Sequence, residues 1–174
     1  MTFPRIPPLA RRLPRLLQLP QLLLAACTLA ALPALALTER LDDSASPRSQ
    51  VSAPLQWSAD AGDASLATAR TRIEYRLATA RYVGKPARVY FVLPALVPGV
   101  LSPSALQMEW RTQGLLGPGR ARLGERVLVW TGTVSGPWLS DTLDLTVQIN
   151  PSALRLSAGM PLRFEPYFEI EVFP

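Results

Sequence analysis

Histidine is absent from this 174-residue sequence, and lysine, asparagine and cysteine each occur once, as Lys85, Asn150 and Cys27. Without histidine the chain has no Ser-His-Asp triad, no Cys-His pair and no histidine-ligated zinc site. Arginine supplies nearly all of the positive charge, and a guanidinium does not lose its proton to act as a general base. We therefore expect a protein that is not an enzyme and that uses no metal ion and no cofactor.

The cysteine and the charged residues are unevenly distributed along the chain. Residues 1–36 hold Cys27 and four of the 18 basic residues but no acidic residue, which leaves 14 basic and 13 acidic residues in the segment 37–174. That segment forms no disulfide, so core burial must stabilise it, and its length suits one domain. Its charge is nearly balanced and it has no basic block, so we expect no nucleic-acid partner.

The N-terminal segment carries the strongest signal in the sequence. Four arginines precede an uncharged stretch over residues 16–37, which contains the small-residue pattern Ala34-Leu35-Ala36. A basic start, an apolar core and an A-x-A ending are typical of a secretory signal peptide. The sequence therefore predicts a signal peptide over residues 1–36, cleaved after Ala36, and an exported protein that is periplasmic or extracellular.

Two alternatives for this segment stay open. Residues 16–37 are long enough to span a bilayer as an uncleaved anchor, with the arginines on the cytoplasmic side. Leu24-Ala25-Ala26-Cys27 resembles the bacterial lipobox, in which the cysteine is lipidated. Contact with a membrane is expected only through residues 16–37 or through a lipidated Cys27, and every alternative exports the rest of the chain.

The pattern after the leader changes near residue 70. Residues 37–69 are rich in Ser, Ala and Asp and are interpreted as a polar arm, with a short edge strand around 51–57. Polar and apolar residues then alternate with a period of two, which predicts strands with one buried and one solvated face. The clearest examples are residues 72–77, 106–111, 143–149 and 168–172. Residues 114–124 are rich in Gly and Pro and predict a turn.

These strands predict an all-β fold for residues 70–174. The frequent prolines prevent long helices, and turn signals separate the short strands. The expected architecture is an antiparallel β-sandwich, immunoglobulin-like in the broad sense, although the Cys-Trp-Cys framework of antibody domains is missing. A small antiparallel barrel is the alternative.

The tryptophans and two glutamates are the candidate contact residues. Trp110 and Trp130 fall in apolar runs and are expected in the core, whereas Trp138 and Trp57 are candidates for contact with a sugar or a partner. Glu169 and Glu171 share one face of the last strand, roughly 6–7 Å apart. That spacing suits a glycosidase acid/base pair, but the favoured interpretation is a solvated edge or cross-strand ion pairs, for example with Arg72 or Arg76.

Six arginines form the last candidate group. One interpretation is a surface for an anionic partner. The other is a solvated mixed-charge surface, which the acids at 74, 109 and 125 among these arginines favour. These arginines are at positions 72, 76, 111, 120, 122 and 126.

The sequence therefore favours an exported, non-enzymatic module of the bacterial cell envelope that binds or assembles with another envelope protein. The first alternative is a carbohydrate- or surface-binding module, supported by Trp138 and Trp57. The second is a pilus-like subunit that exchanges its terminal strand, by analogy with chaperone–usher pili. The third is a hydrolase that uses carboxylates alone, with Glu169 as its first candidate.

Overall fold

The computed structural model describes residues 37–47, 51–53, 56–57, 66–155 and 162–174. The predicted signal peptide and lipobox, with Cys27, Ala34 and Ala36, and all of the alternative anchor 16–37 except Leu37 therefore lie outside the described residues. Within the described ranges, no helix is long and apolar enough to cross a membrane.

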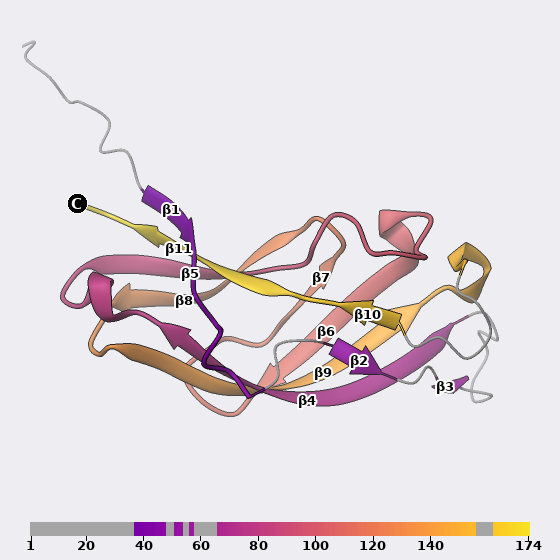
Figure 1. Ribbon diagram of the computed structural model, residues 1–174, viewed down its shortest axis with the longest axis horizontal. Helices are drawn as coiled ribbons and strands as arrows, with labels where there is room; N and C mark the ends of the chain where they lie inside the picture. Colours follow the sequence, from indigo (N-terminus) through magenta and orange to yellow (C-terminus); the bar gives the residue numbers. More distant parts are fainter. Residues whose placement is uncertain (1–36, 48–50, 54–55, 58–65, 156–161) are drawn as a thin grey trace, which may run out of the picture. The chain divides into compact units, whose positions relative to one another are not determined.

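Eleven strands and three short 3-10 turns make up the described secondary structure. One antiparallel sheet has the order β1–β11–β5–β8 and a second has the order β3–β4–β9–β6–β7 (Figure 1). A further pair joins β2 (Val51–Ala53) to β10 (Leu162–Phe164). The four-stranded sheet consists of β1 (Leu37–Arg40), β11 (Tyr167–Val172), β5 (Pro86–Val92) and β8 (Arg126–Thr133). The five-stranded sheet consists of β3 (Gln56–Trp57), β4 (Ala67–Ala78), β9 (Trp138–Ile149), β6 (Leu106–Thr112) and β7 (Gly119–Arg122). The turns are η1 (Ala80–Tyr82), η2 (Pro103–Ala105) and η3 (Pro151–Ala153).

Aromatic side chains from the two sheets meet in the core. Tyr75 of β4 packs edge-on against Phe168 of β11 with ring centroids 4.8 Å apart, and Phe91 of β5 lies 4.8 Å from Trp110 of β6. Such contacts place two sheets face to face, as in a β-sandwich. The all-β prediction is confirmed and the fold is β-sandwich-like (Figure 1); neither main sheet closes into a barrel in the described part of the chain.

The strands β4 and β9 form the longest pair of the fold. Each has twelve residues, and their register runs from Ala67 opposite Ile149 to Ala78 opposite Trp138. On β9 every second side chain from Leu139 to Ile149 is buried, while the positions between them are at least partly exposed. The period of two therefore has the predicted effect: one face of this strand joins the core and the other faces solvent.

Strands also occur in two segments for which the sequence predicted none or only one. Within the predicted polar arm 37–69, β1 pairs with β11, and β2, β3 and the start of β4 follow. Within the predicted turn 114–124, Gly119–Arg122 form β7 and pair with β6. Both β1 and β7 are short strands at sheet edges, where pairing with a long neighbour orders a segment whose own pattern is too short to identify.

Residues 41 and 42, directly after β1, connect the two sheets through backbone hydrogen bonds. The backbone N–H of Leu41 donates to the carbonyl of Phe168 on the four-stranded sheet, at 2.8 Å, and the N–H of Ala78 on β4 donates to the carbonyl of Asp42, at 2.9 Å. Leu41 and Asp43 are both buried in this connection. It therefore covers one open side of the sandwich.

Candidate binding face

The outer surface of the five-stranded sheet is polar along almost its whole length. Because alternate residues of β4, β9, β6 and β7 are buried, the residues between them point to solvent. We call this outer surface the arginine face. Its charged members are Arg70, Arg72, Arg76, Arg111, Arg120 and Arg122 against Glu74, Glu109 and Asp144, a formal net charge of +3.

The central strand β9 contributes the neutral polar groups of this face. It lies between β4 and β6, so the side chains of these two strands flank it at a separation of roughly 10 Å. The register places Arg70 beside Thr146 on one side of β9 and Arg111 beside Asp144 on the other. Hydroxyl, carboxylate and amide groups of β9 therefore lie between the arginines of β4 and those of β6. These groups belong to Ser140, Thr142, Asp144, Thr146 and Gln148.

One ion pair joins the two long strands on this face. Arg72 donates from Nε to Asp144 Oδ1 at 2.6 Å and from a terminal nitrogen to Oδ2 at 3.2 Å. Gln113 Nε2 also donates to Oδ2, at 3.2 Å. The hydrogen bonds from Arg72 lower the pKa of Asp144 below its ordinary value, and those same bonds raise the pKa of Arg72. Asp144 is therefore ionised and directly engaged at neutral pH.

In the described part of the chain most arginines of this face make no ion pair, and neither does Arg88 on β5 of the other sheet. Among the described residues, Arg70, Arg111, Arg120 and Arg122 make no ion pair, and only one of the four ion pairs lies on the arginine face. On and beside the other sheet, Arg40 pairs with Glu165, Arg81 with Glu39 and Arg126 with Glu169. The arginine face thus keeps a formal net charge of +3, and four of its arginines make no ion pair with the described residues.

Two hollows lie over this sheet. The first has a volume of about 460 Å³ and is lined by Arg70, Arg111, Thr146 and Gln148 together with Glu109, Trp110 and Asp144. The second, of about 450 Å³, lies over the other end of β9, next to Arg76, Ser140 and Thr142. Hollows of this size accept a small ligand group, which a flat face would not hold.

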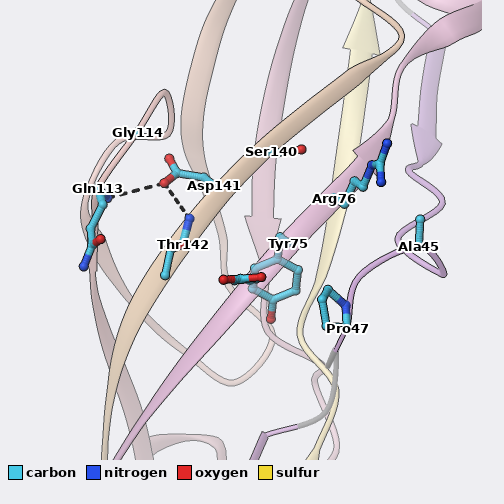
Figure 2. A pocket seen from close by; sticks show the side chains of 10 residues that line it. Ala45, Pro47, Tyr75, Arg76, Gln113, Gly114, Ser140, Asp141 and Thr142 are labelled. Carbon is cyan, nitrogen blue, oxygen red and sulfur yellow. Dashed lines mark hydrogen bonds between the residues drawn. The ribbon is translucent and has the colours of Figure 1, made fainter.

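Asp141 fixes the wall of the second hollow. Figure 2 shows its carboxylate directed at Gln113 and Thr142. Oδ1 accepts hydrogen bonds from the backbone N–H groups of Thr142 at 2.7 Å and Gln113 at 3.3 Å, and Oδ2 accepts one from Leu116 at 2.7 Å. A Cβ on Gly114 would lie 2.9 Å from Oδ1, so this loop approaches the carboxylate with its backbone. Asp141 therefore has a structural role in holding the β6–β7 loop.

Trp138 ends the arginine face. It is 42% exposed, and the guanidinium carbon of Arg76 lies 4.5 Å from the centre of its ring. This cation–π contact orients the indole at the surface. Trp57, the other candidate tryptophan, belongs to β3, where its backbone pairs with Ala67, but its side chain lies outside the described residues. Trp110 is fully buried and Trp130 partly buried.

Glu169 and Glu171 both point away from the core on β11, as their alternation indicates. Glu169 accepts from Arg126 Nε at 2.8 Å, and Glu171 accepts from the Tyr90 hydroxyl at 2.7 Å. Burial, and secondarily the bond to Glu171, raises the pKa of Tyr90. The ion-pair partner of Glu169 is Arg126 of β8, two strands away in the same sheet. It is neither Arg72 nor Arg76, because β4 belongs to the other sheet.

The sequence had named five of the six arginines on this face. It had not named Arg70. The alternation with a period of two on β4 puts Arg70 on the same side of the strand as Arg72 and Arg76, and this pattern could have identified it. It had included Arg126, which lies on β8 of the other sheet.

No group of three or more potential metal ligands occurs in the described ranges. Comparisons with known protein families, with curated proteins and with solved structures found no match.

Proposed function

We propose that this chain is an exported, non-enzymatic binding module of the bacterial cell envelope, and that the arginine face is its contact surface for an anionic partner. The single observation that carries this proposal is the group of arginines without ion pairs on the two sides of β9. Guanidinium groups bind carboxylates and phosphates through two parallel hydrogen bonds. A surface that leaves four of them unneutralised is suited to a partner that brings negative charge.

Other features support a binding module over the remaining alternatives. The terminal strand β11 is paired on both sides, by β1 and by β5, which speaks against strand exchange through it in the manner of a pilus subunit. Glu169 and Glu171 are engaged with Arg126 and Tyr90, which speaks against a hydrolase that uses them. We also propose that the sandwich is immunoglobulin-like in the broad sense, with two antiparallel sheets and no disulfide.

A protein partner was the sequence-based expectation, and an acidic protein surface would satisfy the charge of the face. The carbohydrate alternative gains support from one observation: Trp138 is exposed at the end of a surface made of hydroxyl and amide groups. Both alternatives use the same face.

The proposal is tested by paired substitutions with equal change in charge. Arg70→Gln with Arg111→Gln removes two cations from the face, whereas Arg155→Gln with Arg163→Gln removes two exposed cations elsewhere. Column retention of the protein, as its bacterial host processes it, is compared on carboxylated and neutral matrices. We expect salt-sensitive retention that the first double variant loses and the second keeps; equal behaviour of the two variants would refute a site on this face.

The exported state has its own measurement. Intact mass of the protein isolated from its host distinguishes cleavage after Ala36, lipidation at Cys27 and retention of the whole leader. Recovery of the uncleaved, unmodified chain from the cytosol would contradict the envelope location.

A further inference from the structure

We infer that the anionic partner of the arginine face is an extended acidic polysaccharide, a chain of uronate sugars that lies along β9. This inference rests on the proposed function and names its ligand class. It starts from the order of chemical groups along the face: guanidinium groups at the sides, hydroxyl and amide groups along the middle, and one exposed indole at the end.

The composition of the face distinguishes a glycan from a protein partner. From Ser140 to Gln148 every outward side chain of β9 is polar, and the flanking outward positions of β4 and β6 are also polar. Stable protein interfaces bury aromatic and aliphatic anchors at their centre. Among the described outward side chains of β4, β9 and β6, the one large apolar group is Trp138, at the edge. Side chains that donate and accept hydrogen bonds match the hydroxyl groups of a sugar chain instead.

The acidic residues distinguish a glycan from a phosphate polymer or a lipid surface. Glu74, Glu109 and Asp144 lie among the arginines, so the face alternates between positive, negative and neutral groups. A phosphate backbone presents acceptor oxygens alone, so it has no donors to offer these carboxylates. A uronate chain is also charged on every sugar, but each ring keeps free hydroxyl groups that donate to the acids while its carboxylate meets the arginines. The alternation therefore fits the polysaccharide.

The hollows assign positions to the parts of such a ligand. In the first hollow Arg70 and Arg111 lie on opposite sides of β9 and hold a sugar carboxylate through their guanidinium groups. Glu109 and Asp144 line the same hollow; Asp144 is neutralised by Arg72, and Glu109 accepts from a sugar hydroxyl. Thr146 and Gln148 line the same hollow and meet the neighbouring hydroxyls.

From there the chain follows β9 toward Trp138. The eleven residues from Gln148 to Trp138 span about 34 Å, which is long enough for several sugars in a row. The Arg76 guanidinium lies over one face of the Trp138 indole. The last ring therefore stacks on the opposite face, because a sugar ring presents an apolar face to it.

The test uses polygalacturonate as the acidic chain and its fully methyl-esterified form as the matched neutral chain. Binding to the protein, as its host processes it, is measured by titration calorimetry. We expect binding to polygalacturonate and none to the ester. We expect Arg70→Gln with Arg111→Gln to weaken binding about tenfold or more, since each lost bond is to a charged group. Arg155→Gln with Arg163→Gln serves as the equal-charge control and keeps the affinity.

Two further probes separate the failure of this inference from the failure of the proposed function. Polyglutamate stands for an acidic protein and phosphatidylglycerol vesicles for an anionic membrane. Binding of either probe through Arg70 and Arg111, without binding of polygalacturonate, overturns the inference but leaves the binding face. Binding of none of the three overturns both. Polygalacturonate binding that the face variants leave unchanged places the site elsewhere and also overturns the inference. Thermal unfolding of each variant confirms that the fold is kept.

Discussion

Tyr75 offers the sharpest test of the core. Its side chain is 1% exposed, and its hydroxyl has no hydrogen-bond partner among the described residues. Burial, and then the nearby charges of Asp43 and Glu165, raises the pKa of this phenol far above its ordinary range. The ring itself packs well, with centroids 4.8 Å from Phe168 and 6.2 Å from Phe91. We therefore predict that Tyr75→Phe stabilises the protein.

The magnitude follows from what the substitution removes and what it keeps. A buried polar group without a partner costs roughly 1–3 kcal/mol of desolvation. Phenylalanine keeps the ring and both aromatic contacts, so only the hydroxyl term changes. We expect the free energy of unfolding to rise by about 1 kcal/mol or more. This is the lower end of the range, because the surroundings relax around the hydroxyl and reduce its cost. For a domain of this size that is a rise of roughly 4 °C in Tm.

The assay is urea unfolding followed by circular dichroism, with Tyr90→Phe as the matched control. The Tyr90 hydroxyl donates to Glu171 at 2.7 Å, so the same substitution there removes a hydrogen bond and is expected to destabilise, by about 1 kcal/mol. The two variants therefore change stability in opposite directions. If Tyr75→Phe were destabilised as Tyr90→Phe is, the hydroxyl would gain a hydrogen bond on folding and the reasoning would be refuted.

Two more predictions concern a buried carboxyl and a close backbone contact. Asp43 is 8% exposed, and one of its carboxylate oxygens has no hydrogen-bond partner among the described residues. Burial raises the pKa of this carboxyl, so its ionised form destabilises the fold as the pH rises through the raised value. Asp43→Asn is expected to stabilise the protein at pH 7 and to give no gain below about pH 4, as measured by urea unfolding at each pH. A pH-independent gain would contradict this cause. Gly119→Ala would bring a Cβ to 2.5 Å from Trp110 Cζ2, and we expect it to lower the free energy of unfolding by about 1–3 kcal/mol, measured by calorimetry. Gly136→Ala is the control: the nearest atom to its Cβ lies at 4.0 Å, so its stability is expected to stay near that of the wild type. Equal Tm values for these two glycine variants would exclude a tight contact at Trp110.

The long strands were predictable because their pattern is local and repeated. On β9 the apolar residues recur at every second position over the whole strand, so a single register satisfies all of them. The last strand behaves in the same way: Phe168, Ile170 and Val172 are buried, and Glu169 and Glu171 are partly exposed between them. Where the alternation repeats over six or more residues, burial of the apolar face permits only one strand register.

The short edge strands were not predictable for the opposite reason. Residues Gly119–Arg122 contain one buried side chain, Ala121, within a Gly- and Pro-rich stretch. Their strand conformation depends on β6, with which they pair from Gly119 to Arg122. Leu37–Arg40 depend in the same way on β11. Such strands follow from tertiary pairing rather than from their own sequence.

The candidate site was only partly predictable, because charge pairing depends on which strands become neighbours. Arg72 and Asp144 lie 72 positions apart and meet only because β4 and β9 are adjacent. Arg126 and Glu169 meet on the other sheet, which neutralises one of the arginines named from sequence. The sequence supplied the arginines, but only the strand order separates those that are paired from those that remain available to a ligand.

The two faces of the same strands separate stability from binding. On β4 and β9 the inward residues, such as Ile73, Leu143 and Leu145, provide the apolar burial that holds the sheets together. The outward positions, including Arg70, contribute little to that burial, and solvent-exposed charges add little to stability. Substitutions on the arginine face should therefore leave the fold intact while they change what it binds. This is the physical reason why a loss of binding in Arg70→Gln with Arg111→Gln can be attributed to the face itself.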